Sequence, residues 1–376
     1  MDEFDFLVIG GGIAGVSVAA ELAAHARVIV VEREASLAYH ATGRSAALFT
    51  ETYGPLQIQS LTKASRAFLE HPPEGFAEVG LLKPRGVLLL AGAGQSERIA
   101  ALAAEYGEDE GHAVGVDECL ALVPILRREA IAGGYLEAGA MDLDVHAIHQ
   151  GFLRQARARG ARIATGVPEQ AFERVDLDGV AGWSAMVDGE RVRARVVIDA
   201  AGAWADQVAV SMGAAPMGLT PLRRTALLVD PPAGLDIAAW PAVIDADEGF
   251  YFKPDAGKLL LSPADATPSA PCDAAPDEMD VAIAVDRVQQ AADLPVRRVN
   301  HAWAGLRTFG PDGLPVVGYD PAIEGLFWLA GQGGYGIQTS PAMAKLAAAL
   351  ALGEDVPTDL VGFGVDAGLL APVEIR

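Results

Sequence analysis

Cysteine is scarce in this sequence, which has only Cys119 and Cys272 among 376 residues. Two cysteines cannot form a framework of several disulfides, and neither belongs to a C-x-x-C pair of the kind that binds zinc. The seven histidines show no H-x-x-x-H spacing. We therefore expect no disulfide scaffold and no metal site, and a reducing cytoplasm fits the composition.

Basic residues are also few. The chain has 28 lysines and arginines against 50 aspartates and glutamates, so its formal net charge is −22. A negative field of this size repels phosphate backbones and anionic lipid surfaces. The composition argues against nucleic-acid binding, and the acidic excess is explained most simply by solubility.

Long apolar runs are missing too. The longest uncharged stretch, residues 325–344, is interrupted by several glycines and by polar residues such as Gln332 and Gln338. This pattern is a poor membrane span. The first residues are acidic and lack the basic segment of a signal peptide. We expect no integral membrane segment and a cytoplasmic location.

The chain is long enough for two or three domain-sized units. Residues 4–9 form an apolar run, followed by a glycine cluster, an alanine-rich helical stretch to about residue 24 and a second apolar run at 27–31. This order predicts a βαβ unit. A helix within 142–160, a strand at 161–164 and a strand at 191–198 have the pattern of further pieces of a parallel sheet.

Other segments read as strands without crossover helices. They are residues 87–90, 225–229, 249–252, 258–261 and 302–307. The turn Pro254-Asp255-Ala256-Gly257 predicts a hairpin between two of them. We infer an α/β domain of the Rossmann type together with an α+β domain built on an antiparallel sheet, interleaved with the first.

The first glycine cluster has the spacing Gly10-x-Gly12-x-x-Gly15, and Glu32 ends the next strand. In this context glycines permit a tight turn and close approach of a pyrophosphate, and an acidic residue accepts hydrogen bonds from ribose hydroxyls. The pattern predicts dinucleotide binding. An acid at position 32 disfavours the 2′-phosphate of NADP, so FAD and NAD remain.

A second glycine-rich segment, Gly331-Gln332-Gly333-Gly334-Tyr335-Gly336, precedes a helix expected to start near Ser340. Its amides could face a flavin ring or ribityl chain, which favours FAD over NAD. A purely structural turn is the alternative.

Five motifs together resemble the FAD-dependent D-amino-acid oxidase family, which includes glycine and sarcosine oxidases. They are the fingerprint of residues 10–32 and the strings at 41–47, 200–204, 307–318 and 333–339. Within that family, the strings at 40–45, 221–224, 250–257 and 303–307 are most similar to bacterial D-arginine dehydrogenases.

The resemblance implies a noncovalent, extended FAD. The implied cofactor-binding residues are Gly10, Gly12, Ile13, Ala14, Gly15, Glu32, Arg33, Thr42, Gly43, Arg44, Ser45, Ala47, Gln170, Ala201, Gly202, Trp204, Gly305, Arg307, Gly333, Gly334, Tyr335, Gly336, Ile337, Gln338 and Thr339. The motif order implies an FAD-binding domain made of 1–80, 141–217 and 309–376. The substrate-binding domain then comprises 81–140 and 218–308.

The same resemblance implies that Arg223 and Arg307 hold a substrate carboxylate. A guanidinium suits this role because its planar fork makes two parallel hydrogen bonds to a carboxylate. Neighbouring residues on a strand face opposite sides, so only one of Arg223 and Arg224 can enter a cleft. From the residues alone, a surface ion pair is the simpler reading of either arginine.

The other residues implied for the catalytic site are Tyr53, Tyr251, Gln338, Leu48 and Val87. Positions 48 and 87 depart from the D-arginine dehydrogenases, which have a histidine and a side-chain-binding glutamate there. Without a carboxylate at Val87 a cationic side chain would lack a partner. We therefore expect neutral or apolar side chains to be preferred over arginine and lysine.

The expected reaction is oxidation of a D-amino acid by hydride transfer from Cα to flavin N5, giving a 2-oxo acid and ammonia. Its partners are a small amino-acid substrate and an electron acceptor, either oxygen or a quinone-type compound. Oxidation of a secondary amine of the sarcosine, glycine or proline type, or of a 2-hydroxy acid, remains an alternative. A catalytically weak flavoprotein subunit is a third possibility.

Overall fold

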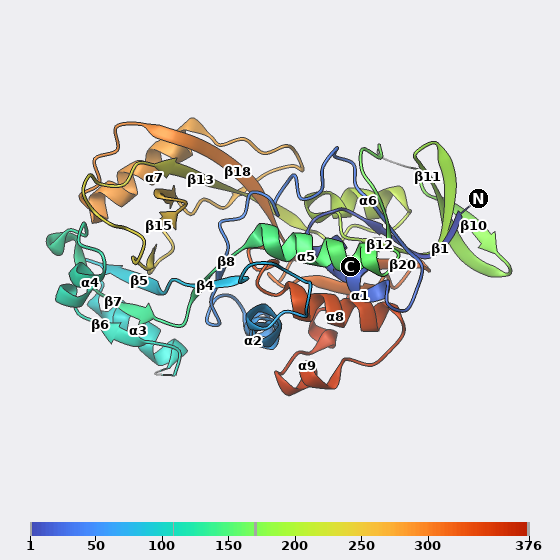
Figure 1. Cartoon of the computed structure of the whole chain (residues 1–376), viewed down its shortest axis with the longest axis horizontal. Helices are drawn as coiled ribbons and strands as arrows, with labels where there is room; N and C mark the ends of the chain where they lie inside the picture. The colour runs from blue at the N-terminus through green and yellow to red at the C-terminus, as the bar shows by residue number, and fades with distance from the viewer. Residues whose placement is uncertain (1, 108, 169–170, 374–376) are drawn as a thin grey trace.

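Two large sheets at opposite ends of the long axis form the framework of the computed structural model (Figure 1). The structure describes residues 2–107, 109–168 and 171–373. One sheet has eight strands and the other has nine, and a three-stranded sheet lies near the chain segments that connect them. The fold is therefore a mixed α/β fold with several sheets, as the sequence predicts.

The eight-stranded sheet has a parallel centre. Its parallel strands are β1 (Asp2–Ile9), β2 (Val28–Val31), β9 (Arg162–Ala164), β12 (Glu190–Asp199) and β20 (Leu326–Ala330). Antiparallel strands extend it: β10 (Glu173–Leu177), β11 (Val180–Val187) and β19 (Val316–Tyr319). Strands from three distant parts of the chain thus meet in one sheet.

Three helices pack together beside this sheet. They are α1 (Ile13–Leu22), α5 (Val145–Ala158) and α8 (Ser340–Ala351). α1 and α8 are rich in alanine and are apolar on nearly every face, which is typical of helices buried inside a large core. The βαβ unit, the helix within 142–160 and the helix near Ser340 are confirmed.

The nine-stranded sheet carries the other half of the molecule. In spatial order it contains β17 (Thr267–Pro268), β13 (Thr220–Val229), β16 (Lys258–Ser262), β15 (Tyr251–Asp255), β14 (Ala242–Asp245), β5 (Val87–Gly92), β7 (Ile131–Glu137) and β6 (His112–Val114). β18 (Val299–Phe309) pairs with β13. The expected antiparallel sheet and the β15–β16 hairpin are present, but β5 and β14 pair in parallel.

Smaller elements complete the fold. The three-stranded sheet contains β3 (Leu48–Phe49), β8 (Met141–Leu143) and β4 (Leu82–Pro84). The remaining helices are α2 (Leu56–Glu70), α3 (Ser96–Tyr106), α4 (Val116–Leu122), α6 (Ala205–Ser211), α7 (Glu278–Ala291) and α9 (Thr358–Gly362). None of the helices within the described ranges combines the length and apolarity that a membrane crossing requires.

The strands of the two large sheets come from alternating parts of the chain. β1, β2, β9 to β12, β19 and β20 build the eight-stranded sheet, whereas β5 to β7 and β13 to β18 build the other. This alternation is consistent with interleaved domains. The boundaries at 80, 140, 217 and 308 stay a prediction.

Candidate active site

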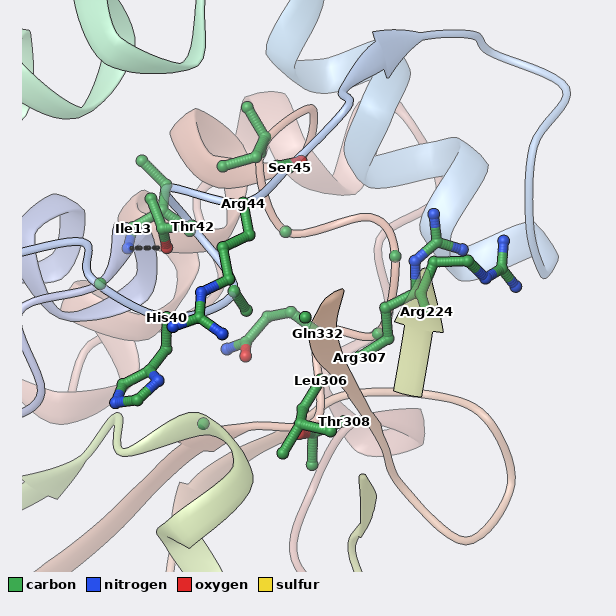
Figure 2. Close-up of a pocket in the computed structure, with 18 of the residues that line it drawn as sticks. Ile13, His40, Thr42, Arg44, Ser45, Arg224, Leu306, Arg307, Thr308 and Gln332 are labelled. Atoms are coloured by element: carbon green, nitrogen blue, oxygen red, sulfur yellow. Dashed lines mark hydrogen bonds between the residues drawn. The ribbon is translucent and has the colours of Figure 1, made fainter. Parts of the chain in front are cut away.

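A cavity of about 770 Å³ brings the predicted motifs together. It runs from the carboxyl ends of β1 and β2 to one face of the nine-stranded sheet, and Figure 2 shows part of its lining. Volumes of this order are typical of sites that enclose a small molecule. The cavity therefore joins the dinucleotide motif to the antiparallel sheet.

The turn after β1 can be built only with glycine at two positions. Gly10 has φ +107°, and a Cβ there would lie 2.4 Å from the carbonyl oxygen of Ala200. A Cβ on Gly15 would lie 1.9 Å from the carbonyl oxygen of Gly10. Glycine is therefore required for the tight packing of this turn, and Gly10 and Gly12 also line the cavity, where a dinucleotide pyrophosphate would lie.

Glu32 is held in place at the end of β2. Its Oε2 accepts a hydrogen bond from Gly11 N at 2.7 Å, and its Oε1 accepts one from Glu34 N at 2.8 Å. The side chain also lines the cavity, so lone pairs of the fixed carboxylate remain for a ribose. This arrangement fits the adenosine end of FAD.

The N-terminus of α1 faces the segment at residues 40–47. Thr42 Oγ1 accepts a hydrogen bond from Ile13 N at 3.0 Å, which is the dashed line in Figure 2. His40 bonds Glu34 Oε1 at 2.9 Å and lies against Trp204, which also carries the Arg33 guanidinium on its face. Polar and aromatic groups are thus gathered where the resemblance implies the adenosine and pyrophosphate.

Most of the predicted cofactor residues line the cavity. Those that do so are Gly10, Gly12, Ile13, Ala14, Glu32, Arg33, Thr42, Arg44, Ser45, Ala47, Ala201, Gly202, Trp204, Gly305, Arg307, Gly333, Gly334, Gly336 and Ile337. Gly15, Gly43, Gln338 and Thr339 do not line it, and Tyr335 lines only a smaller adjoining cavity of about 390 Å³. Gln170 lies outside the described residues.

Gln338 has a supporting position instead of a cavity-lining one. It is buried, its Nε2 donates to Thr62 Oγ1 at 2.9 Å, and its Oε1 accepts from Thr50 N at 3.2 Å. The side chain thereby ties the C-terminal glycine-rich segment to α2 and to the strand end that precedes Tyr53. Because it is buried and does not line the cavity, it supports the site and does not face a substrate.

Arg224 on β13 and Arg307 on β18 enter the cavity from adjacent strands. Arg224 on β13 is paired with Gly305 on β18, so Arg307, two residues further on, is its diagonal neighbour on the same face. Figure 2 draws both side chains in the same part of the pocket. Burial and the nearby Arg307 lower the pKa of Arg224. We call these two residues the arginine pair.

The placement of Arg223 corrects the sequence prediction. Arg223 lies on the opposite face of β13 and does not line the cavity. Its guanidinium donates to Asp280 on α7 at 2.8 Å and also faces Asp265 and Asp277. The alternation of side chains along a strand is the physical reason, because only one of two neighbours can face the cavity.

The predicted tyrosines flank the arginine pair. The Tyr53 hydroxyl lies 3.4 Å from a terminal nitrogen of Arg307, and Arg224 lies over the Tyr251 ring at 6.0 Å. Burial disfavours the cationic form of Arg307, but Tyr53 and Tyr251 outweigh this and its pKa is raised overall. Both guanidiniums therefore stay charged and available to an anion.

The opposite part of the cavity is mainly apolar. Leu48 and Val87 line it together with Leu89 and Ile244. Glu137, which the sequence does not single out, also lines this wall and is the cross-strand partner of Val87. Asp245, Asp247 and Glu248 line the cavity as well. The preference for neutral side chains, which rests on the absence of a carboxylate at position 87, stays a prediction.

The placement of Glu32 predicts weaker cofactor binding in Glu32→Gln. The amide keeps one acceptor oxygen and turns the other into a donor, so the Kd of FAD should rise roughly tenfold or more. Glu70→Gln is the matched control, since Glu70 binds Arg66 on α2 and does not line the cavity. Flavin fluorescence titration of the apoproteins measures both. Equal affinities in the two variants would contradict the assignment.

Comparisons with known proteins agree with this site. Residues 5–350 match the family described as FAD dependent oxidoreductase (DAO). The chain is 26% identical to the uncharacterized oxidoreductase YurR of Bacillus subtilis, covering 97% of this chain and 99% of that protein. It is also 26% identical to the glycine oxidase of Geobacillus kaustophilus, covering 96% of each.

Solved structures share the fold. The crystal structure of that glycine oxidase superimposes with a TM-score of 0.82 at 22% identity and covers all of both chains. An L-alpha-glycerophosphate oxidase from Mycoplasma pneumoniae with FAD bound superimposes with a TM-score of 0.81 at 18% identity, covering 94% of this chain and 95% of that one. The chain therefore belongs to the DAO family of FAD-dependent oxidoreductases, and FAD is its cofactor.

Proposed function

We propose that the protein oxidises the Cα–N bond of a D-amino acid to an imino acid, which water hydrolyses to a 2-oxo acid and ammonia. The observation that carries this proposal is the arginine pair in the cavity that also contains the dinucleotide motif. Two charged forks on one face of a sheet are suited to a single carboxylate. Amino acids and hydroxy acids both carry such a carboxylate next to the carbon that would be oxidised.

The chain's own residues act by binding and orientation. Arg224 and Arg307 would fix the α-carboxylate, and the glycine-rich segment at 333–337 borders the same space. FAD, when bound, supplies the two-electron acceptor that takes the hydride from Cα. Fixing the carboxylate limits the positions available to Cα–H, which is the main contribution that the protein can make.

An amine substrate is favoured over a hydroxy acid because no free histidine lines the described part of the cavity. Hydroxyl oxidation needs a proton acceptor, and histidine most often fills that role. Of the described residues, His40 is the one histidine that lines the cavity, and it is engaged with Glu34 and Trp204. An amine that binds unprotonated needs no such base.

Support for amino-acid substrates also comes from the relatives. The glycine oxidase of Geobacillus kaustophilus is named for an amine substrate. The strings that resemble those of D-arginine dehydrogenases favour the D configuration. The expected preference of the enzyme for substrates with neutral side chains depends on the absence of a carboxylate at position 87. Glu137 lies beside Val87 and supplies a carboxylate there, so the proposal covers D-amino acids with either neutral or cationic side chains.

The experiment is anaerobic mixing of the holoenzyme with candidate substrates while the flavin absorbance near its visible maximum is followed. The panel contains D- and L-leucine, D-methionine, D-ornithine, glycine, sarcosine, proline and 2-hydroxyisocaproate. Rapid bleaching by D-amino acids is expected. Bleaching only by sarcosine or proline, or only by the hydroxy acid, would replace the proposal by one of those reactions. Oxygen uptake against dye reduction then identifies an oxygen or a quinone-type acceptor.

A further inference from the structure

Glu137 is a buried acid that the proposed reaction does not use. It is the last residue of β7, its side chain is 4% exposed, and it lines the cavity. Because it is the direct cross-strand partner of Val87 on β5, both side chains point to the same face of the sheet. The carboxyl group therefore lies at the cavity wall.

The carboxyl group has hydrogen-bond donors but no cation beside it. The Thr52 hydroxyl donates to Oε2 at 2.7 Å and Glu51 N donates to Oε1 at 3.2 Å. Within the described part of the chain, no lysine, arginine or histidine nitrogen lies within 4.0 Å of it. A buried carboxylate is costly without a counter-charge, and its oxygens can accept further hydrogen bonds. Because Glu137 lines the cavity, a bound molecule there could supply the partner.

The sheet that forms one wall of the cavity places the arginine pair and Glu137 on different strands, with apolar side chains between them and Asp245 also lining the cavity. Arg224 and Tyr251 lie on β13 and β15, then the apolar Ile244 and Leu89 follow on β14 and β5, and Glu137 stands beyond them on β7. Adjacent strands lie about 4.8 Å apart, so roughly 14 Å of sheet separates the backbones at Tyr251 and Glu137. The acid is thus removed from the arginine pair by an apolar strip.

We infer that Glu137 determines side-chain specificity by receiving an ammonium or guanidinium group at the far end of the substrate's side chain. This inference rests on the proposed function, which places the α-carboxylate at the arginine pair. The methylene groups of the substrate would then lie along the apolar strip. Because Cα stays close to the arginine pair, Glu137 acts on the distal group and takes no part in the oxidation.

The pH dependence of this recognition has a defined sign. Burial raises the pKa of Glu137 to about 7, and the hydrogen bonds from Thr52 and Glu51 N limit the rise. The other titratable groups around it are Glu51, Glu110, Lys63, Tyr106 and Tyr135. The carboxyl group gains its charge as pH rises through this value, so preference for a cationic side chain should grow from pH 6 to pH 8.5.

Two pairs of near-isosteric substrates isolate the distal charge. D-ornithine and D-norleucine differ by an ammonium in place of a methyl group, and D-arginine and D-citrulline differ by a guanidinium in place of a urea. We expect the holoenzyme at pH 8.5 to favour the cationic member of each pair in kcat/KM by roughly tenfold or more. Glu137→Gln should remove this preference and its pH dependence while leaving D-norleucine turnover within about threefold.

Glu110→Gln is the matched control, because it makes the same change of charge at a nearby acid that binds Lys63 and does not line the cavity. It should keep the preference. Equal loss of D-ornithine and D-norleucine turnover in Glu137→Gln would overturn the inference, because it would indicate a role at the reacting centre. If that variant fails to bind FAD, a ratio near one in the unmodified enzyme at pH 8.5 overturns it equally. Failure of every D-amino acid to reduce the flavin would instead overturn the proposed function.

Discussion

Replacing Arg307 by methionine is expected to lower kcat/KM for amino-acid oxidation by about a thousandfold. Arg307 projects from β18 into the cavity, beside Tyr53 and the backbone of Gly334. Loss of one partner from a desolvated, hydrogen-bonded charge pair costs about 2–5 kcal/mol, and methionine keeps most of the side-chain volume. Steady-state kinetics with D-leucine measures the loss.

Flavin content separates this effect from a folding defect. Arg307→Met should purify with FAD, because Arg307 is one of many residues implied for FAD and those at the dinucleotide motif, such as Gly10, Glu32 and Thr42, are unchanged. A holoprotein with nearly unchanged kcat/KM would show that Arg307 does not hold the substrate. An effect on KM alone, with kcat preserved, would indicate binding without orientation.

The second large effect is a contrast between adjacent residues. Arg224→Met should lower kcat/KM about a hundredfold, because it removes the second fork of the arginine pair. Arg223→Met should change kcat/KM by less than about threefold, because its guanidinium faces Asp280 on the other side of the sheet and is not in the cavity. The same kinetic assay, with thermal unfolding to detect any loss of stability, compares the two variants.

The opposite ranking would contradict the structural assignment. If Arg223→Met were the more damaging variant while retaining FAD and stability, β13 would present the other face to the substrate. A double variant of Arg224 and Arg307 provides a further check, since two residues that hold one carboxylate should give losses that are not additive.

The cofactor half of the site could be read from the sequence because its signals are local. Gly10, Gly12 and Gly15 follow a strand and open a helix, and Glu32 ends the next strand, so one short βαβ unit contains the whole pattern. Steric conflict at Gly10 and Gly15 explains why the glycines are needed. The conflict at Gly15 is with Gly10 in the same turn, whereas the conflict at Gly10 is with Ala200, so the spacing can be read locally although part of its cause lies elsewhere in the fold.

The substrate half depends on strand register, which no local pattern reveals. The choice between Arg223 and Arg224 follows from the pairing of Arg224 with Gly305, two residues before Arg307. A shift of one residue in the pairing of β13 would have turned Arg223 toward the cavity and Arg224 away from it. Gln338 was misplaced for a similar reason, since its partners Thr50 and Thr62 are almost 300 positions away in the chain.

Glu137 illustrates a non-local signal that is invisible in the sequence. It ends a strand without any motif, and its relation to the cavity comes only from its pairing with Val87, fifty positions earlier. A buried strand pattern ending in an acid is consistent with either a surface residue or a site residue. Only the sheet order, with β7 beside β5, decides between them.

The central claim is that Arg224 and Arg307 hold the carboxylate of an amino acid in the cavity that binds FAD. Anaerobic flavin reduction by D-leucine and by D-leucinamide tests it directly, because the two compounds differ only at the carboxyl group. The structure predicts that the neutral amide reduces the flavin at least about a hundredfold more slowly at subsaturating concentration. Equal rates for the acid and the amide would contradict the claim.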